Sequence, residues 1–272
     1  MYFALLYKKI DNIWMKEENM SYTAGNLPDN KHCFFGSAGG VSRGKYTSLN
    51  TNLSSFDSSD NLRRNFEIIS GYFNKCPEDM FTLRQSISNI AVSAENPSWF
   101  KIAADGAVTT DKNILLGVKT ADCAPILLAD YKNGVIGVAH AGWRGAYKGI
   151  IENVVKLMCD KGAKVENIAA CIGPCMQQDS FEVKSDMRQI LLEIDENNVL
   201  YFKDGKDEEH FYFDLSGYAE AKLRKIGVEN IDNSHIDTYP LQNGYFSYRR
   251  NTHLNLITAP RDYPTQYSCI CL

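Results

Sequence analysis

Two short stretches decide how this chain is expected to fold: Thr120-Ala-Asp-Cys123 and Val138-Ala-His140-Ala-Gly-Trp-Arg-Gly145. Around them lie apolar runs, each with the length of a buried β-strand, at residues 115–119, 125–129 and 135–139. The Tyr-Lys-Asn-Gly sequence at 131–134 favours a hairpin turn between the last two runs. The pattern therefore predicts adjacent strands that place the Cys123 thiol opposite the His140 imidazole.

The segment after His140 is expected to start a helix. Glycines on either side of Trp143-Arg144 permit a tight turn, and residues 146–161 carry a broad apolar stripe with Gly162 in the position of a C-terminal cap. Polar side chains would then gather near a helix N-terminus, where anions are favoured. This arrangement is typical of a small-molecule site.

The remaining pattern alternates strands and helices. Apolar spacing predicts a helix over 60–73 capped by Asp60, and a buried strand over 167–172. Further helices are expected near 185–195 and 216–226, the latter opened by Asp214 or Ser216. No linker or repeat marks a boundary, so we predict one α/β (α+β) domain over residues 1–272, with mixed sheets flanked by helices.

Composition narrows the class of protein. The chain has 272 residues, 44% of them hydrophobic, which suits a packed globular core. Its net charge is -4 with scattered basic residues, so neither a nucleic-acid nor a membrane partner is expected. The N-terminus lacks a secretory leader pattern, which predicts a cytoplasmic location and reduced thiols for the eight cysteines.

Cys123 and His140 are the leading candidates for chemistry. A thiolate and an imidazole are two of the ligands that zinc or copper prefers. The same pair would also suit a nucleophile and its base, with Asp122 or Asp105 orienting the ring. A buried cysteine beside a hydrogen-bonded core histidine is the alternative without function. Arg249 and Arg250 either clamp an anion or are ordinary solvated arginines.

Six motifs in a fixed order lie at 39–50, 105–109, 121–123, 140–145, 172–183 and 246–250. The most specific is His140-Ala-Gly-Trp-Arg-Gly145. In this order they resemble bacterial laccase-domain proteins, a family also called purine nucleoside phosphorylases or peptidoglycan editing factors. The matches run from about residue 33 to 250, so the chain is identified as a member of this family.

The resemblance implies a single-domain α/β protein with a His-Cys-His site for zinc or copper. It also implies phosphorolysis of adenosine and inosine, with some adenosine deamination by a metal-activated water. The partners would be a purine nucleoside and phosphate. On this basis the catalytic candidates are Cys123, His140, Asp122 and Arg144, the metal candidates are Cys123 and His140, and the substrate-binding candidates are Asn50, Asp105, Arg249 and Arg250.

The chain departs from the family pattern at several site positions. Gln85-Ser-Ile87 stands where the family has Gln-Val-His with its first ligand, and isoleucine cannot coordinate a metal. The family's Thr-Arg-x-Gly-Gly is Gly36-Ser-Ala-Gly-Gly40 here, its Cys-Thr-Tyr is Asp237-Thr-Tyr239, and its Thr-Gly-Arg is replaced by Asn251-Thr-His-Leu254. Two remaining ligands predict a metal that is weakly bound or absent.

These features support three hypotheses about function. The first is a metal-dependent purine nucleoside phosphorylase. The second is a cysteine-dependent amide hydrolase that edits a cell-wall precursor, with Cys123 as nucleophile and His140 as base. The third is a nucleoside-binding protein of reduced activity, supported by Ile87. Dioxygen-reducing copper chemistry needs several histidine-rich centres, which five scattered histidines do not supply.

Overall fold

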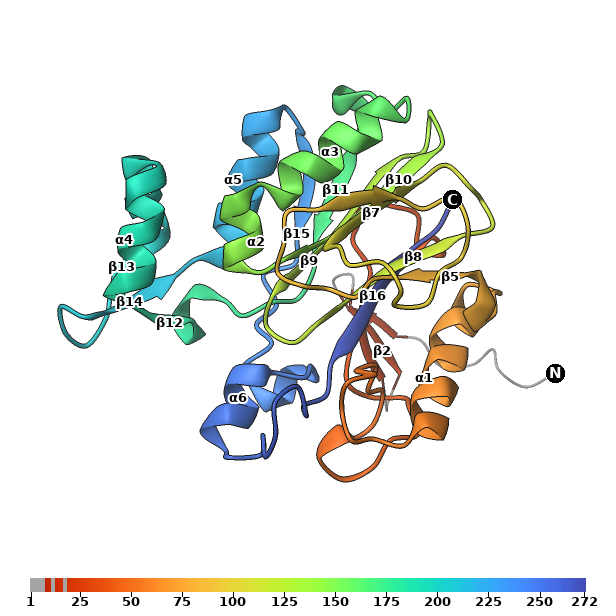
Figure 1. Cartoon of the computed structure of the whole chain (residues 1–272), viewed down its shortest axis with the longest axis horizontal. Coiled ribbons are helices and arrows are strands. Elements are labelled where there is room, and N and C mark those ends of the chain that lie inside the picture. The colour runs from red at the N-terminus through yellow and green to blue at the C-terminus, as the bar shows by residue number, and fades with distance from the viewer. Residues whose placement is uncertain (1–7, 11–12, 17–18) are drawn as a thin grey trace.

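The computed structural model describes residues 8–10, 13–16 and 19–272 (Figure 1). At its centre lie β9 (Ala124–Asp130) and β10 (Val135–Ala141), an antiparallel hairpin joined by the predicted turn. The Asp130 carboxylate closes this turn by accepting the Asn133 backbone N–H at 3.0 Å. Every residue of both strands is buried, as their apolar sequence predicts.

The hairpin forms the middle of a six-stranded mixed sheet with the order β15-β11-β9-β10-β7-β6. The β11–β15 and β6–β7 pairs are parallel and the others antiparallel. The outer strands are β6 (Ala91–Ser93), β7 (Gly106–Thr109), β11 (Ala169–Ile172) and β15 (Asn230–Asn233). The strand expected over 167–172 is thus confirmed as β11.

A second sheet of seven strands contains β8 (Leu115–Thr120), in the order β1-β2-β3-β4-β16-β8-β5. Residues 121–123 therefore carry the chain from one sheet into the other, with Asp122 at φ +86°. The remaining strands are β1 (Lys8–Ile10), β2 (Ile13–Lys16), β3 (Asn19–Tyr22), β4 (His32–Phe35), β5 (Met80–Thr82) and β16 (Gln266–Ile270). A third sheet, β12-β14-β13, comprises β12 (Glu182–Lys184), β13 (Phe202–Asp204) and β14 (His210–Phe213).

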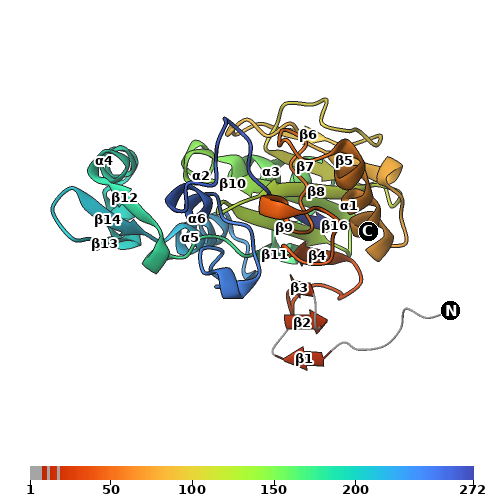
Figure 2. The ribbon, with the colours of Figure 1, turned by 90° about the horizontal axis from the view of Figure 1, so that it is seen from below.

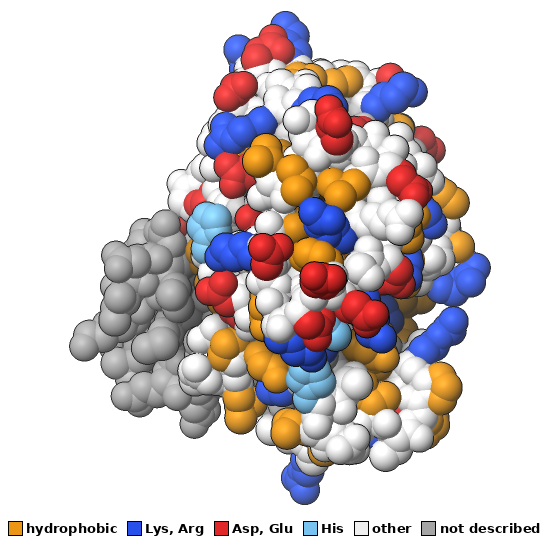
Figure 3. Space-filling view, turned by 90° about the vertical axis from the view of Figure 1, so that its left-hand side faces the viewer, with side chains coloured by type: hydrophobic (Ala, Val, Ile, Leu, Met, Phe, Trp, Pro, Cys, Tyr) orange, Lys and Arg blue, Asp and Glu red, His pale blue; other side chains and the backbone are white. Residues whose placement is uncertain are grey.

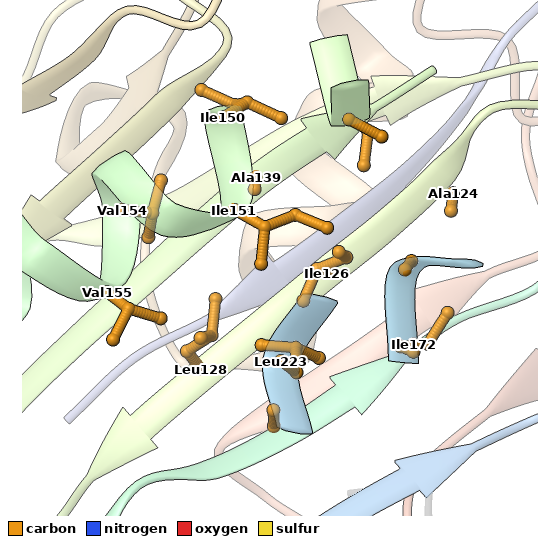
Figure 4. Packing of buried hydrophobic residues seen from close by; sticks show 14 of the residues in the cluster. Ala124, Ile126, Leu128, Ala139, Ile150, Ile151, Val154, Val155, Ile172 and Leu223 are labelled. Carbon is orange, nitrogen blue, oxygen red and sulfur yellow. The ribbon is translucent and has the colours of Figure 1, made fainter. Parts of the chain in front are cut away.

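The two large sheets face each other across an apolar layer. Leu127 of β9 and Ile136 of β10 meet Leu116 of β8 in this layer. Alternate residues of the hairpin, such as Ile126 and Leu128, point the other way and pack against helices (Figure 4). Because both faces are covered, the hairpin strands read as continuous apolar runs rather than as alternating ones.

The helices on the outer face differ from the expected single helix over 146–161, which was wrong. The structure has two helices, α2 (Trp143–Lys148) and α3 (Ile150–Asp160), separated by Gly149 at φ +95°. Glycine adopts this left-handed conformation without a steric cost, which ends α2 and turns the chain. Ile151 and Val154 of α3 then pack on the hairpin beside Leu223 of α5 (Leu215–Ile226) (Figure 4).

The other helices are close to expectation. Asp214 caps α5 as predicted, accepting the Gly217 N–H at 2.8 Å. The cap of α1 (Ser59–Tyr72), however, is Ser58 rather than Asp60, because the Ser58 hydroxyl accepts the Asn61 N–H at 3.1 Å. The rest are α4 (Ser185–Ile194), α6 (Tyr248–His253) and 3-10 turns at Gly44–Tyr46, Pro77–Asp79, Val165–Asn167, Gln178–Ser180, Glu196–Tyr201 and Leu241–Asn243.

The layers thus run from α3 and α5, through the six-stranded and then the seven-stranded sheet, to α1 (Figure 1), and Figure 2 views them from below. Mixed sheets flanked by helices confirm the predicted α/β (α+β) class. The third sheet and α4 project to one side, where acidic and basic side chains are interspersed over the surface (Figure 3). None of the described helices has the length and apolar character needed to cross a membrane.

Candidate functional site

His140 lies near the end of β10, beside the start of β7. Its ring Nδ1 donates to Asp105 Oδ1 at 2.7 Å, and its backbone N–H donates to the Asp105 carbonyl at 2.7 Å. The carboxylate acceptor keeps a proton on Nδ1, so Nε2 is the ring nitrogen that faces the site. Burial would lower the pKa of His140, but the interactions with Cys123 and Asp105 outweigh it and raise the pKa to about 9.

Asp105 connects His140 to the loop that contains Ile87. Its carboxylate accepts the N–H groups of Ser86 at 3.1 Å, Ile87 at 3.2 Å and Ser88 at 2.7 Å, and the Ser88 hydroxyl at 2.6 Å. The side chain is fully buried. Burial would raise the pKa of Asp105, yet the bonds from His140 and Ser88 hold it well below its usual range.

Ile87 lies in this loop in an unusual conformation. Its φ is +60°, in the left-handed region that β-branched residues rarely adopt, and its side chain is 50% exposed. The three amide bonds to Asp105 hold the loop in place. The position at which the resemblance expects a ligand histidine is therefore presented beside His140 with a side chain that has no donor atom.

Cys123 stands in the crossing between β8 and β9, opposite His140. A hydrogen bond between the Cys123 thiol and the His140 ring contributes to the raised pKa of His140. Gly142, which precedes α2, leaves room for the thiol, because a Cβ at Gly142 would lie 2.9 Å from Cys123 Sγ. The structure thus brings Cys123, His140 and Asp105 together in one group.

Asp122, the neighbour of Cys123, connects the crossing to later parts of the chain. Its carboxylate accepts the Thr238 hydroxyl at 2.7 Å and the Arg249 backbone N–H at 2.7 Å. Burial raises its pKa despite these bonds. This geometry makes Asp122 a residue that positions the 121–123 crossing.

The other predicted substrate-binding residues lie in different settings. Arg249 Nη1 donates to the Glu182 carbonyl at 2.8 Å, and Arg250 donates to the carbonyls of Thr238, Tyr239 and Tyr245 at 2.7–2.8 Å. Asn50 is fully buried and accepts two backbone N–H groups through Oδ1. Arg144 is exposed and stacks on Trp143, with Cζ 4.2 Å from the ring centroid.

The donor atoms do not complete a metal site. Within residues 8–10, 13–16 and 19–272, no three His, Cys, Asp or Glu side chains are grouped so as to hold a metal ion. Cys123 and His140 supply two donors, Ile87 supplies none, and the Asp105 carboxylate is occupied by His140 and the 86–88 loop. The side chains present therefore do not fit a three-ligand zinc or copper centre.

Some residues near the site were not predicted. The Gln85 side chain forms two hydrogen bonds with the backbone of Lys119: its Nε2 donates to the Lys119 carbonyl at 2.8 Å, and its Oε1 accepts the Lys119 N–H at 2.9 Å. Ser88 completes the contacts of Asp105. Both flank Ile87 in the same short motif. Their polar character was the available signal, but polar residues in a loop are commonly solvated.

Comparison with known proteins places these motifs in a family. The family described as multi-copper polyphenol oxidoreductase laccase matches residues 31–257. A purine nucleoside phosphorylase of Rickettsia prowazekii is 42% identical over 192 residues, which cover 71% of this chain and 78% of that protein. An adenosine deaminase of an unknown prokaryotic organism is 36% identical over 150 residues, covering 54% of this chain and 56% of that protein.

The fold has a counterpart among solved structures. A Neisseria meningitidis protein superposes with a TM-score of 0.80 at 28% identity, covering 93% of this chain and 98% of that chain. The chain belongs to the family described as multi-copper polyphenol oxidoreductase laccase, the laccase-domain family that its motifs resemble.

Proposed function

We propose that this chain is a purine nucleoside phosphorylase, which cleaves adenosine or inosine with phosphate to a free base and ribose 1-phosphate. The main support is the Cys123, His140 and Asp105 group in a chain that is 42% identical to a protein with that name. We place the reaction in the cytoplasm, where the unpaired state of all eight cysteines would persist.

The residues of this site suit the departure of a purine. The bond between ribose C1′ and purine N9 breaks, a phosphate oxygen bonds to C1′, and the leaving base takes up a proton. Asp105 holds His140 through Nδ1, and the raised pKa of about 9 keeps the ring protonated near neutral pH, so Nε2 carries the proton that is donated. Cys123 interacts with the His140 ring, and the exposed Arg144 lies four residues after His140 in the same motif.

Metal binding by this chain is proposed to be weak or absent. Catalytic zinc sites generally use three protein ligands, and this site offers two. Adenosine deamination is a second candidate activity, supported by the identity to the protein named adenosine deaminase. Ile87 supports the alternative of a nucleoside-binding protein of reduced activity. The His140–Asp105 bond beside a thiol supports the alternative of a cysteine-dependent amide hydrolase.

The test combines metal content with release of hypoxanthine from inosine, measured with and without phosphate. For the wild type we expect little zinc or copper and slow phosphate-dependent release, which is lost in Cys123→Ala. Ile87→His should raise the zinc content toward one per chain and speed up release, because it supplies the missing donor. Elemental mass spectrometry on protein without a histidine tag measures the metal.

Ile90→His is the matched control, because Ile90 is 49% exposed in the same loop and its side chain does not belong to the group around His140. It should change neither metal content nor rate. A wild type that is stabilised by inosine but forms no product would replace the phosphorylase with the binding protein. Cleavage of an amide substrate that requires Cys123 would favour the hydrolase.

A further inference from the structure

Phosphorolysis requires a place for an anion, and the described site residues leave this place unassigned. The side chains of Arg250 and Asn50 are hydrogen-bonded to backbone groups of the chain itself. The Arg249 side chain is also bonded to a carbonyl. Besides Arg144, which stacks on Trp143, two other cations lie near the 121–123 crossing: Lys119 and Arg261.

Lys119 is a partly buried ammonium at the end of β8, close to the crossing that contains Cys123. Its Nζ donates to Asn52 Oδ1 at 3.0 Å, a neutral acceptor that leaves two of the three N–H donors for other partners. Its backbone is bonded to Gln85, two residues before Ile87. Burial and the nearby Arg261 lower the pKa of Lys119 to about 8.

Asn52 also fixes the segment that carries Arg261. Its Nδ2 donates to the Arg261 carbonyl at 2.8 Å and to the Tyr263 carbonyl at 2.7 Å. Burial, followed by the charge of the nearby Cys123, raises the pKa of Tyr263. One asparagine thus joins the Lys119 ammonium to a segment that runs from Arg261 to the neighbourhood of Cys123.

Two like charges close together are unfavourable unless an anion lies between them. In the part of the chain that the structure describes, neither Lys119 nor Arg261 forms an ion pair with a carboxylate. Asp262, next to Arg261, is bonded to Lys45, Tyr46 and the Phe56 N–H. A bound anion would supply the missing counter-charge.

We propose that Lys119 and Arg261 form the subsite for inorganic phosphate, with Asn52 holding the two cations in register beside Cys123. This inference rests on the proposed phosphorolysis and names the residues that bind its second substrate. A guanidinium and an ammonium are the side chains that recognise a phosphate by charge and by several hydrogen bonds. An anion between them also removes the repulsion present in the free protein.

The test measures binding of inorganic phosphate by titration calorimetry at constant ionic strength, which does not depend on turnover. The wild type should bind phosphate saturably, and Lys119→Gln and Arg261→Gln should each weaken it by roughly tenfold or more. Lys132→Gln, an exposed lysine in the β9–β10 turn, is the control and should bind like the wild type. Arg261 is exposed, so its variant is expected to fold even if Lys119→Gln does not.

A phosphorolysis assay adds a second readout. In both variants the KM for phosphate should rise while the KM for inosine stays within about twofold. Saturable phosphate binding without any product would contradict the proposed phosphorylase activity and support the phosphate subsite. Normal phosphate affinity in both variants, or tighter Lys119-dependent binding of adenosine 5′-monophosphate than of inorganic phosphate, would overturn the subsite.

Discussion

Asp105 is the residue on which the candidate site depends most, since one buried carboxylate holds both His140 and the 86–88 loop. Asp105→Asn should lower the free energy of unfolding by about 2–4 kcal/mol, because an amide cannot accept all these donors and leaves some unpaired. Turnover should fall by roughly 10–100-fold as the imidazole loses its orientation. Denaturant unfolding and the hypoxanthine assay measure the two effects.

Asp130→Asn separates the two effects. Asp130 is also fully buried and accepts the N–H groups of Asn133 and Lys164, but it lies at the far end of β9 from Cys123. It should cost comparable stability and leave the rate per folded molecule unchanged. An equal loss of rate in both variants would show that Asp105 acts on activity only through stability.

Single residues also show what the sequence alone reveals. Cys123, His140 and Asp105 were predicted because their types suit chemistry and their motifs sit at strand ends. Lys119 was not, since a lysine at the end of a strand is usually solvated, and only the fold shows that Lys119 is partly buried near Arg261. The roles of Asn50 and Arg250 depend on which carbonyls and amides lie nearby, which spacing does not encode.

Gly142, at the junction of β10 and α2, links an element boundary to the thiol. Its backbone φ is -72°, so alanine fits the main chain, but its Cβ would lie 2.9 Å from Cys123 Sγ. Gly142→Ala should therefore change stability by only about 1 kcal/mol, because a thiol can rotate away, while activity falls by roughly tenfold or more. Thermal unfolding and inosine cleavage measure these outcomes.

Gly71→Ala is the same substitution in α1, where a new Cβ would meet nothing within 4 Å. It should raise stability by about 0.5–1 kcal/mol through helix propensity and leave cleavage unaffected. If Gly142→Ala kept full activity, the close approach of Gly142 to Cys123 would have no functional role.

Boundaries of elements were harder to predict than their existence. The apolar stripe over 146–161 correctly indicated a helical region, but the left-handed Gly149 divides it, and periodicity does not detect one glycine. Ser58 and Asp60 are both good caps, and the hydroxyl of Ser58 makes the bond. Where two neighbouring residues are equally suited to cap a helix, the packing of the folded chain decides which of them does so.

For the molecule as a whole, stability should depend on pH through His140 and Asp105. The raised pKa of His140 contributes stability that is complete below about pH 6.5 and is lost as pH rises through about 9. The lowered pKa of Asp105 contributes stability above about pH 4, which is lost on further acidification. The free energy of unfolding of the wild type should therefore exceed that of His140→Gln by the largest amount between about pH 4 and 6.5.

Between pH 6 and 10 this difference should shrink by about 3 kcal/mol, measured by denaturant unfolding at each pH. Lys119 titrates near the upper end with the opposite sign, because its folded pKa lies below the unfolded value. Subtracting one protein from the other removes its contribution. A constant difference across this range would contradict the proposed ionic pairing of His140.

The overall architecture was predictable because the strands at 115–139 are long, apolar and separated by a clear turn. The division of these strands between two sheets was not, since β8 and β9 are both buried and their sequences fit either sheet. The likeness to the laccase-domain family supplied the site residues that physical pattern alone left open.

Because of the crossing at residues 121–123, the candidate site is complete only when both large sheets have formed. Cys123 belongs to the link between the two sheets, whereas His140 and Asp105 are held by the six-stranded sheet alone. In a partly folded chain with only the six-stranded sheet formed, His140 and Asp105 would be in place but Cys123 would not. Catalytic competence should thus appear late in folding, only after the two sheets have docked.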